Sequence, residues 1–279
     1  MYIQWFPGHM TKAMRMLQES VNIADCVVYV LDARAIASSF NGKFDAIIGN
    51  RPVLYVVNKC DMVEQTELKL WEKRFALEGK TCVFSDSTSG RYKSVCISKL
   101  LQINNSVISK YKEKGVNKCI RAIVVGVPNT GKSTLINCLC GSKRATTGNR
   151  PGVTKGKQWV SISDGIDLLD TPGTLPPAFD DNEKAVHLAM IGSVKEEVLD
   201  IGELALEVIK LFKGRNSREF IERYGIDGYC QDDVQTLEEI AMSRRYILGR
   251  NNIDYERASR AIIDDLRKLK FGKIMLDRA

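Results

Sequence analysis

The chain has 279 residues, with a hydrophobic fraction of 44% and a charged fraction of 27%, values that place it among globular proteins and predict two domains of ordinary size. No apolar run approaches the ~20 residues that span a bilayer, and no basic segment followed by an apolar stretch opens the chain, so we expect a cytoplasmic protein without a membrane partner. The formal net charge of +7 favours a polyanionic partner only weakly, because many basic proteins bind no nucleic acid.

Short apolar, β-branched runs recur in the first part of the chain and alternate with segments typical of helices or loops. Several runs end in a polar residue or a glycine, such as Asp32, Asn58, Gly126 and Asp170. Open α/β sheets present ligand-binding groups in this way, at the carboxyl ends of their strands. The pattern predicts a six-stranded, mostly parallel sheet. Its expected strands are Cys26–Leu31, Val53–Val57, Thr81–Phe84, Ala122–Val125, Gln158–Ile162 and Ile166–Leu169.

The pattern changes near Asn182, where strand-like runs end and apolar residues begin to fall three and four positions apart. This spacing is typical of amphipathic helices. Prolines at positions 172, 176 and 177 indicate an extended connection before the change. We therefore predict an α/β domain over residues 1–180 and an all-α domain over residues 181–279.

The segment Gly126-Val-Pro-Asn-Thr-Gly-Lys-Ser133 follows an apolar strand and precedes a helical run, which is the context of a phosphate-binding P-loop. Its glycines allow backbone N–H groups to surround phosphates at a helix N-terminus. Lys132 would neutralise β- and γ-phosphate oxygens, and Ser133 would be a ligand of Mg²⁺. The expected nucleotide-binding residues here are Asn129, Thr130, Gly131, Lys132, Ser133 and Thr134.

Asp170-Thr-Pro-Gly173 ends another apolar strand. At this place a carboxylate can hold a Mg²⁺-bound water, and the N–H of Gly173 can meet the γ-phosphate. Asp-x-x-Gly alone is also a common turn, so the motif gains its meaning from the P-loop beside it.

Asn58-Lys59-Cys60-Asp61 closes a third apolar strand. A carboxylate such as that of Asp61 can accept both the ring N–H and the exocyclic amino protons of guanine, a pattern that adenine lacks, and the Lys59 stem can pack on the base. A polar turn at a strand end is the alternative. Together with the other two motifs, the segment predicts GTP and GDP as ligands.

These motifs, in this order, resemble the circularly permuted GTPases, and closely the ribosome biogenesis GTPase A subfamily, also called YlqF. The residues that carry the resemblance are Trp5-Phe-Pro-Gly-His-Met10, Asp32-Ala-Arg34, 58–61, 126–133, Pro151-Gly-Val-Thr154 and 170–173. Ordinary GTPases have the P-loop first and the guanine motif later, whereas this chain has the reverse order. The resemblance implies a permuted P-loop GTPase domain followed by an all-α domain.

The resemblance also implies further ligands of the bound ions and nucleotide. Thr154 matches the threonine that completes Mg²⁺ coordination in the GTP state. Asn129 matches the asparagine that helps hold K⁺ in potassium-stimulated GTPases, so K⁺ joins Mg²⁺ as a candidate cofactor. Asp86 and Ser87 lie where the family has its second base-contacting loop, although the usual Ser-Ala is Ser-Thr here.

The group that orients the attacking water is the least determined part of the site. Thr174 stands where Ras-like enzymes have a glutamine, and its short hydroxyl would orient water poorly. His9 resembles the N-terminal histidine proposed to activate water in this subfamily, and an ordinary histidine pKa near 6.5 suits that role. The alternative is an N-terminal arm in which His9 packs against the ribosome or the protein itself.

The C-terminal domain of the family is taken to contact ribosomal RNA. Arginines and lysines suited to this are frequent here, but acidic neighbours also allow a solvated helix face as the alternative. The candidate contacts are Arg244, Arg245, Arg250, Arg257, Arg260, Arg267, Lys268, Lys270 and Lys273.

These motifs predict a GTP hydrolase, and the resemblance implies that it acts in late large-subunit assembly, binding the immature 50S subunit and its rRNA in the GTP state and leaving on hydrolysis. We expect slow intrinsic turnover that the ribosome stimulates, and a monomer when free. The alternatives are a GTP-dependent structural tether and a permuted GTPase that acts on another RNA or a membrane partner.

Overall fold

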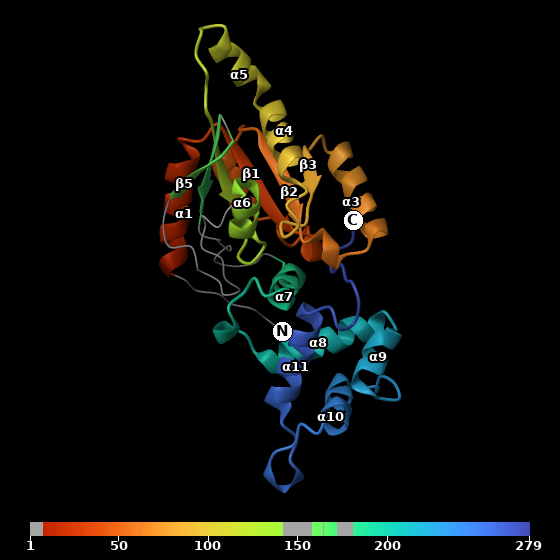
Figure 1. Ribbon diagram of the computed structural model, residues 1–279. Helices are drawn as coiled ribbons and strands as arrows, with labels where there is room; N and C mark the ends of the chain where they lie inside the picture. Colours follow the sequence, from red (N-terminus) through yellow and green to blue (C-terminus); the bar gives the residue numbers. More distant parts are fainter. Residues whose placement is uncertain (1–7, 142–157, 164, 172–180) are drawn as a thin grey trace. The chain divides into compact units, whose positions relative to one another are not determined.

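The computed structural model describes residues 8–141, 158–163, 165–171 and 181–279 (Figure 1). The chain divides into two compact units. The nucleotide-binding unit contains the described residues up to Thr171 and the last five residues, Met275–Ala279. The helical unit ends at Ile274. Among the described helices, none combines the length and the apolar character needed to cross a bilayer.

The nucleotide-binding unit is built on the predicted six-stranded sheet, whose strand order is β3-β2-β1-β4-β6-β5. All neighbouring strands pair in parallel except β5 and β6, which are antiparallel. The central strand β1 is buried along its whole length, which explains its continuous apolar sequence. The strands are β1 Cys26–Asp32, β2 Val53–Asn58, β3 Cys82–Phe84, β4 Ile120–Val125, β5 Gln158–Ser163 and β6 Ile166–Asp170.

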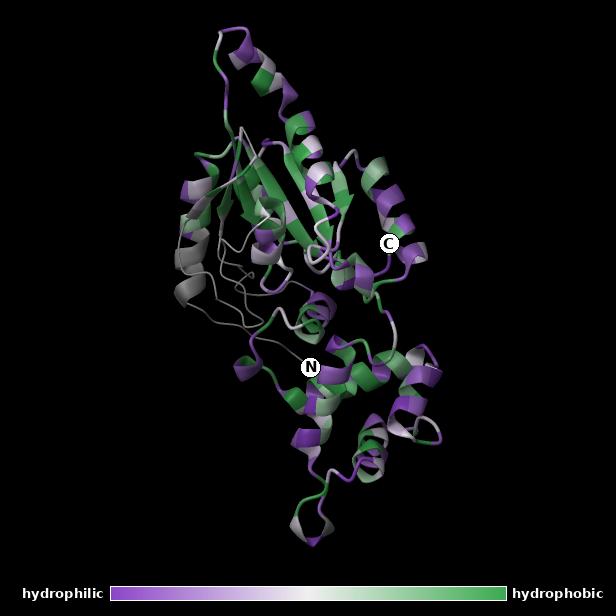
Figure 2. Cartoon of the chain, viewed as in Figure 1, coloured by the Kyte–Doolittle hydropathy of each residue, from purple (hydrophilic) through white to green (hydrophobic). Residues whose placement is uncertain are grey.

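Helices cover both faces of this sheet and divide the core into two layers. One layer joins alternate residues of β1 to α1, α2 and α3, and the other joins the remaining residues to α4 and α6. The hydropathy colouring shows apolar strands inside helices of mixed character (Figure 2). The helices are α1 Gly8–Val21, α2 Gly42–Ile48, α3 Gln65–Leu77, α4 Lys93–Ile103, α5 Asn105–Lys112 and α6 Lys132–Cys140.

The helical unit has the predicted all-α character. Each of the five α-helices described in this unit begins after a residue whose side-chain oxygen accepts a backbone N–H of the first turn, the usual signal for a helix start. Its aromatic core brings Phe271 to 4.9 Å from Phe212 and 4.8 Å from Phe220 between ring centroids. The helices are α7 Asn182–Met190, α8 Ile201–Gly214, α9 Arg218–Tyr224, α10 Asp233–Ser243 and α11 Tyr255–Arg267.

The division of the chain differs at one place from the predicted domains 1–180 and 181–279. The change from one unit to the other falls after Thr171 and before Asp181, outside the described residues, so the predicted boundary after residue 180 stays a prediction. Residues Met275–Ala279, however, pack with the nucleotide-binding unit. The reason is that these residues contact others far away in the sequence, as described below. No local sequence pattern predicts such contacts.

Candidate nucleotide-binding site

The predicted motifs meet at the carboxyl ends of three adjacent strands. Strand β1 ends at Asp32, which pairs in register with Asn58 at the end of β2. Strand β4, on the other side of β1, ends at Val125 and leads into the P-loop. Segments separated by about 70 residues in the sequence therefore form one edge of the sheet, where α/β proteins bind ligands.

Two glycines give the P-loop its shape. Gly126 and Gly131 have φ angles of +152° and +92°, in the region that favours glycine. A Cβ atom would run into the backbone carbonyl of Val30 at the first position and into the side-chain amide of Asn58 at the second. The loop passes too close to its neighbours for any larger residue.

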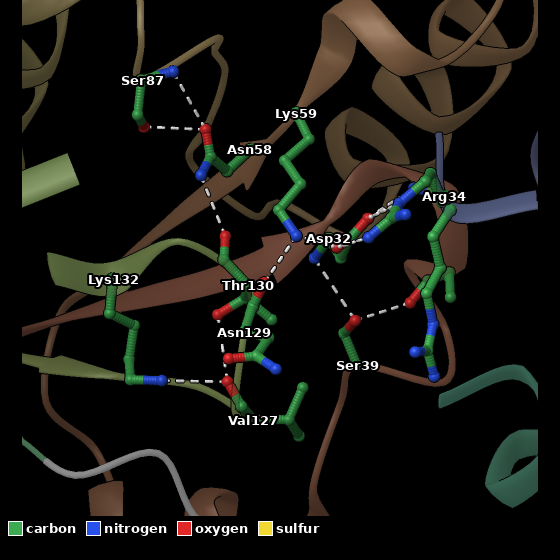
Figure 3. Close-up of polar contacts among 12 residues, drawn as sticks. Asp32, Arg34, Ser39, Asn58, Lys59, Ser87, Val127, Asn129, Thr130 and Lys132 are labelled. Carbon is green, nitrogen blue, oxygen red and sulfur yellow. Dashed lines mark hydrogen bonds and ion pairs between the residues drawn. The ribbon is translucent and has the colours of Figure 1, made fainter. Parts of the chain in front are cut away.

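Lys132 begins α6 and is 6% exposed. Its Nζ donates a hydrogen bond to the backbone carbonyl of Val127 within the loop, at 2.9 Å. The ammonium group therefore lies against the backbone of the P-loop (Figure 3). At the N-terminus of a nine-residue helix, this positive charge adds to the helix dipole and favours an anion such as a phosphate.

Asn58 ties the predicted guanine motif to the P-loop. Its Nδ2 donates to the backbone carbonyl of Thr130 at 2.9 Å, and its Oδ1 accepts from the Ser87 backbone N–H at 3.1 Å and hydroxyl at 2.7 Å. Asn58 and Ser87 are both buried. The amide thus fixes three loops relative to one another, and a buried group of this kind is costly to remove.

Lys59, which adopts a left-handed φ of 63°, lies in a second polar network beside the amide. Its Nζ contacts Asp32 Oδ2 at 2.8 Å and donates to the backbone carbonyl of Asn129. Asp32 also accepts two hydrogen bonds from the Arg34 guanidinium, at 2.9 and 2.8 Å. Figure 3 shows the ammonium group between the carboxylate and the P-loop.

The charges of this network stabilise one another. Burial opposes the charged form of Asp32, but Arg34 and Lys59 outweigh it and hold the pKa of the carboxyl well below its usual range. Burial lowers the pKa of Lys59, and Asp32 counteracts that effect. Cys60, the next residue, is buried, and its thiol pKa is raised to about 12, chiefly by that burial. The network therefore carries two cations around one carboxylate.

The remaining predicted base contacts lie on the same rim. Asp61 is exposed in a short 3-10 helix, Cys60–Met62. Asp86 Oδ1 accepts from the Thr88 backbone N–H at 2.9 Å and hydroxyl at 2.6 Å, so this carboxylate holds its own turn. The role of Asp86 in base binding stays a prediction.

The Mg²⁺ ligands predicted from the sequence are only partly within the described residues. Ser133 and Thr134 lie in the first turn of α6 and are half-buried. Asp170 is the last residue of β6. The hydroxyl of Thr171, the next residue, donates a hydrogen bond to the Val124 carbonyl at 2.5 Å. Thr154 and Gly173 lie outside the described residues.

His9 is in α1, but its side chain is not among those described.

Sequence reasoning missed the role of Asp32 and Arg34. Asp32 was recognisable as a polar residue at the end of a buried strand, but its contact with Lys59 spans 27 residues. The P-loop, the guanine motif and Asp32 are joined and can together bind a purine nucleotide. The cationic side chains suit its phosphates, and the exposed carboxylate of Asp61 suits its base.

Several known proteins are similar to this chain over nearly its whole length. Residues 121–239 match the family described as "50S ribosome-binding GTPase". Ribosome biogenesis GTPase A of Bacillus cereus is 35% identical over 99% of this chain and 94% of its own, and mitochondrial ribosome-associated GTPase 1 of Bos taurus is 30% identical over 99% of this chain and 88% of its own. The crystal structure of GNP-bound YlqF from T. maritima has a TM-score of 0.65 and 25% identity, over 96% of this chain and 98% of that one.

Proposed function

Because this chain belongs to the ribosome biogenesis GTPase A family, whose members are GTP hydrolases of ribosome assembly, we propose that it acts on the large ribosomal subunit. In this proposal the GTP form docks on the immature subunit, and hydrolysis releases it. The match of residues 121–239 to 50S ribosome-binding GTPases supports this choice of subunit.

The assignment of guanine nucleotides as ligands rests on one observation, namely that the guanine motif is hydrogen-bonded directly to the P-loop. Asn58 bonds to the Thr130 carbonyl and Lys59 to the Asn129 carbonyl. A nucleotide with phosphates at Lys132 would thus carry its base past the Lys59 stem toward Asp61. We assign guanine recognition to Asp61, because its carboxylate matches the two donors of guanine.

The residues present fit Mg²⁺ bound to the phosphates. The P-loop packs so closely on its neighbours that a Cβ at Gly131 would clash with the Asn58 amide. Ser133 lies in the first turn of α6, and its hydroxyl is the kind of hard oxygen ligand that Mg²⁺ prefers. Thr154 and Asp170, the latter through water, complete the proposed set. Bound Mg²⁺ would neutralise phosphate charge. Asn129, with a φ of 60° in the loop, is the proposed contact for K⁺.

The chain's own residues supply positioning and charge for hydrolysis. Lys132 faces the phosphate cradle from α6, and its charge stabilises the negative charge that builds up on the transferred phosphoryl oxygens. His9 is the proposed group for orienting water, because Thr174 is too short for that role. We expect slow intrinsic turnover that the ribosome accelerates by completing the site.

The α10–α11 connection is the part of the helical unit that best fits RNA. Arg244, Arg245 and Arg250 are exposed there. The last two have left-handed φ angles of 56° and 62°, which are uncommon for non-glycine residues and more frequent at functional sites. Arg260, in contrast, contacts Glu196 and Glu256 at 3.3 and 3.0 Å. Cations without carboxylate partners support phosphate binding better than paired ones.

The structural tether is the second candidate, favoured by the absence of a glutamine at position 174. GTP turnover measured with and without large subunits, in K⁺ and then in Na⁺, separates the two. We expect strong stimulation by the 50S subunit in K⁺ and a smaller one in Na⁺. If His9→Ala loses the stimulation by the large subunit but keeps its GTP affinity, the tether hypothesis is wrong. GTP-independent sedimentation with large subunits would contradict the switch.

A further inference from the structure

The last residues of the chain hold the loop that follows β1. Asp277 accepts two hydrogen bonds from Ser38, one from its backbone N–H and one from its hydroxyl, both at 2.7 Å. The backbone N–H of Leu276 donates to the carbonyl of Arg34, also at 2.7 Å. These contacts join residues 239 positions apart in the sequence.

This C-terminal segment, Met275–Asp277, is packed as part of the nucleotide-binding unit. Met275 is 3% exposed and belongs to the core layer formed by β1 and α3. The indole N–H of Trp71 points to its sulfur at 3.1 Å. Ser38, the partner of Asp277, is 2% exposed. Because a buried hydroxyl and an N–H both donate to the same carboxylate, this attachment is costly to break.

The loop that the segment holds leads directly to the guanine motif. The carbonyl of Arg34 accepts the Leu276 N–H, and the guanidinium of Arg34 donates two hydrogen bonds to the Asp32 carboxylate. Asp32 holds the Lys59 ammonium, which in turn donates to the carbonyl of Asn129 in the P-loop. A continuous chain of buried or half-buried polar contacts thus runs from Leu276, the residue before Asp277, to the nucleotide site.

The segment is also the point where the chain leaves the helical unit. Ile274 is the last residue of that unit and is 4% exposed, and Phe271 packs within its aromatic core. Met275, the next residue, belongs to the other unit. Any strain on this peptide connection therefore acts directly on the Arg34 carbonyl and on Ser38.

We propose that Asp277 is a positioning residue for guanine nucleotide binding: by holding Ser38 it keeps the Leu276 N–H on the Arg34 carbonyl. This keeps Asp32 in contact with Lys59, and so keeps the Lys59 stem in place for the base. The proposal rests on the assignment of residues 58–61 as the guanine motif. It gives the helical unit a route to the nucleotide affinity, because what loosens the C-terminal segment also loosens Lys59.

The test is the dissociation rate of fluorescently labelled GDP and GTP from the full chain. We expect Asp277→Ala to raise both rates by the same factor, about five- to tenfold, at the lower end of ordinary coupling between sites. GDP and GTP share the same base, so a change at the base should raise both dissociation rates equally. A change at the phosphates would alter the two rates by different factors. The kcat at saturating GTP should not change. Arg278→Ala, an exposed neighbour, is the matched control and should dissociate like the wild type.

A second background distinguishes positioning from a general loss of structure. Lys59→Met keeps the apolar stem and removes the ammonium group, so the polar chain ends before the P-loop. In this background Asp277→Ala should have no further effect on dissociation. Equal acceleration in both backgrounds, or unchanged rates in Asp277→Ala itself, overturns the proposal. A wild-type chain that binds neither GDP nor GTP would instead refute the nucleotide site.

Discussion

The side-chain amide of Asn58 donates a hydrogen bond to the backbone carbonyl of Thr130 at 2.9 Å, across 72 residues of sequence. One residue of the guanine motif thereby sets the shape of the loop that receives the phosphates. Base recognition and phosphate binding are therefore expected to change together when this amide is altered.

Replacing Asn58 by alanine removes this bond and leaves the Ser87 N–H and hydroxyl without their buried acceptor. We expect a loss of about 2 kcal/mol in the free energy of unfolding, measured by urea denaturation, and weaker GTP binding. Gln102→Ala on the exposed side of α4 should change stability by less than about 0.5 kcal/mol.

Asn58→Asp refines this test, since it keeps an acceptor for Ser87 but turns an oxygen toward the Thr130 carbonyl. It should weaken GTP binding more than it weakens stability when compared with Asn58→Ala. Equal GTP affinity in wild type and Asn58→Asp would show that the contact with Thr130 does not shape the P-loop.

Gly131→Ala should abolish tight GTP binding. The new Cβ would run into the Asn58 amide, at a backbone φ of +92°. We expect GTP affinity to fall at least about tenfold, equivalent to about 1.4 kcal/mol, measured by nucleotide titration. The control is Gly141→Ala at the other end of α6, where φ is +69° but the nearest atom, Lys93 Nζ, is 3.7 Å away. This variant bears only the backbone strain of about 1–2 kcal/mol, so its GTP affinity should stay near that of the wild type.

Asp32→Asn should destabilise the domain by about 3 kcal/mol at neutral pH, because it leaves the buried charges of Arg34 and Lys59 without their carboxylate. The pKa of Asp32 in the folded state lies well below the ordinary aspartate value of 3.8. Its stabilising effect is therefore complete well above pH 3.8 and is lost as the pH falls from there toward the folded-state pKa. The difference between wild type and variant should shrink over that range in chemical denaturation.

Glu78→Gln provides the contrast for this pH dependence. The pKa of Glu78 is also lowered, first by its hydrogen bond to Lys80 and then by that to Arg74, but the pair is exposed at the surface. An exposed pair contributes at most about 1 kcal/mol. A loss in Asp32→Asn no larger than in Glu78→Gln would contradict the buried network.

The strands were predictable because buried parallel strands have continuous apolar sequences, and the six expected runs agree with the observed sheet. The exact ends of the strands were less predictable. Asp32 and Asn58 extend β1 and β2 by one residue each, since the strand ladder continues through that pair. The P-loop and guanine motif were visible as local patterns. The contacts that join them were not, because those of Asn58, Lys59 and Asp277 depend on how distant segments pack.

The salt dependence of binding tests the arginines of the α10–α11 connection. Replacing Arg244, Arg245 and Arg250 together by alanine should reduce the slope of log affinity against log salt for large-subunit RNA by about 2, because each lost phosphate contact removes about 0.7–0.9. The matched control removes three paired cations of the same unit, Lys213, Arg260 and Lys268. Equal slopes in the two triple variants would place the RNA contacts elsewhere.

Asp61→Asn should change which base the protein prefers. The exposed carboxylate of Asp61 accepts two donors from guanine, whereas a carboxamide offers one acceptor and one donor, the pattern that complements the ring N–H and 2-carbonyl of xanthine. A lost hydrogen bond to a charged group costs about 1.5–3 kcal/mol, so GTP affinity should fall by about ten- to 100-fold while XTP affinity rises, as measured by competition with labelled nucleotide. Asp86→Asn is the informative comparison, because its carboxylate already holds Thr88 and its variant should keep the preference for guanine. If Asp86→Asn rather than Asp61→Asn shifts the preference to xanthine, the base is recognised by the second loop and not by the residues that are bonded to the P-loop.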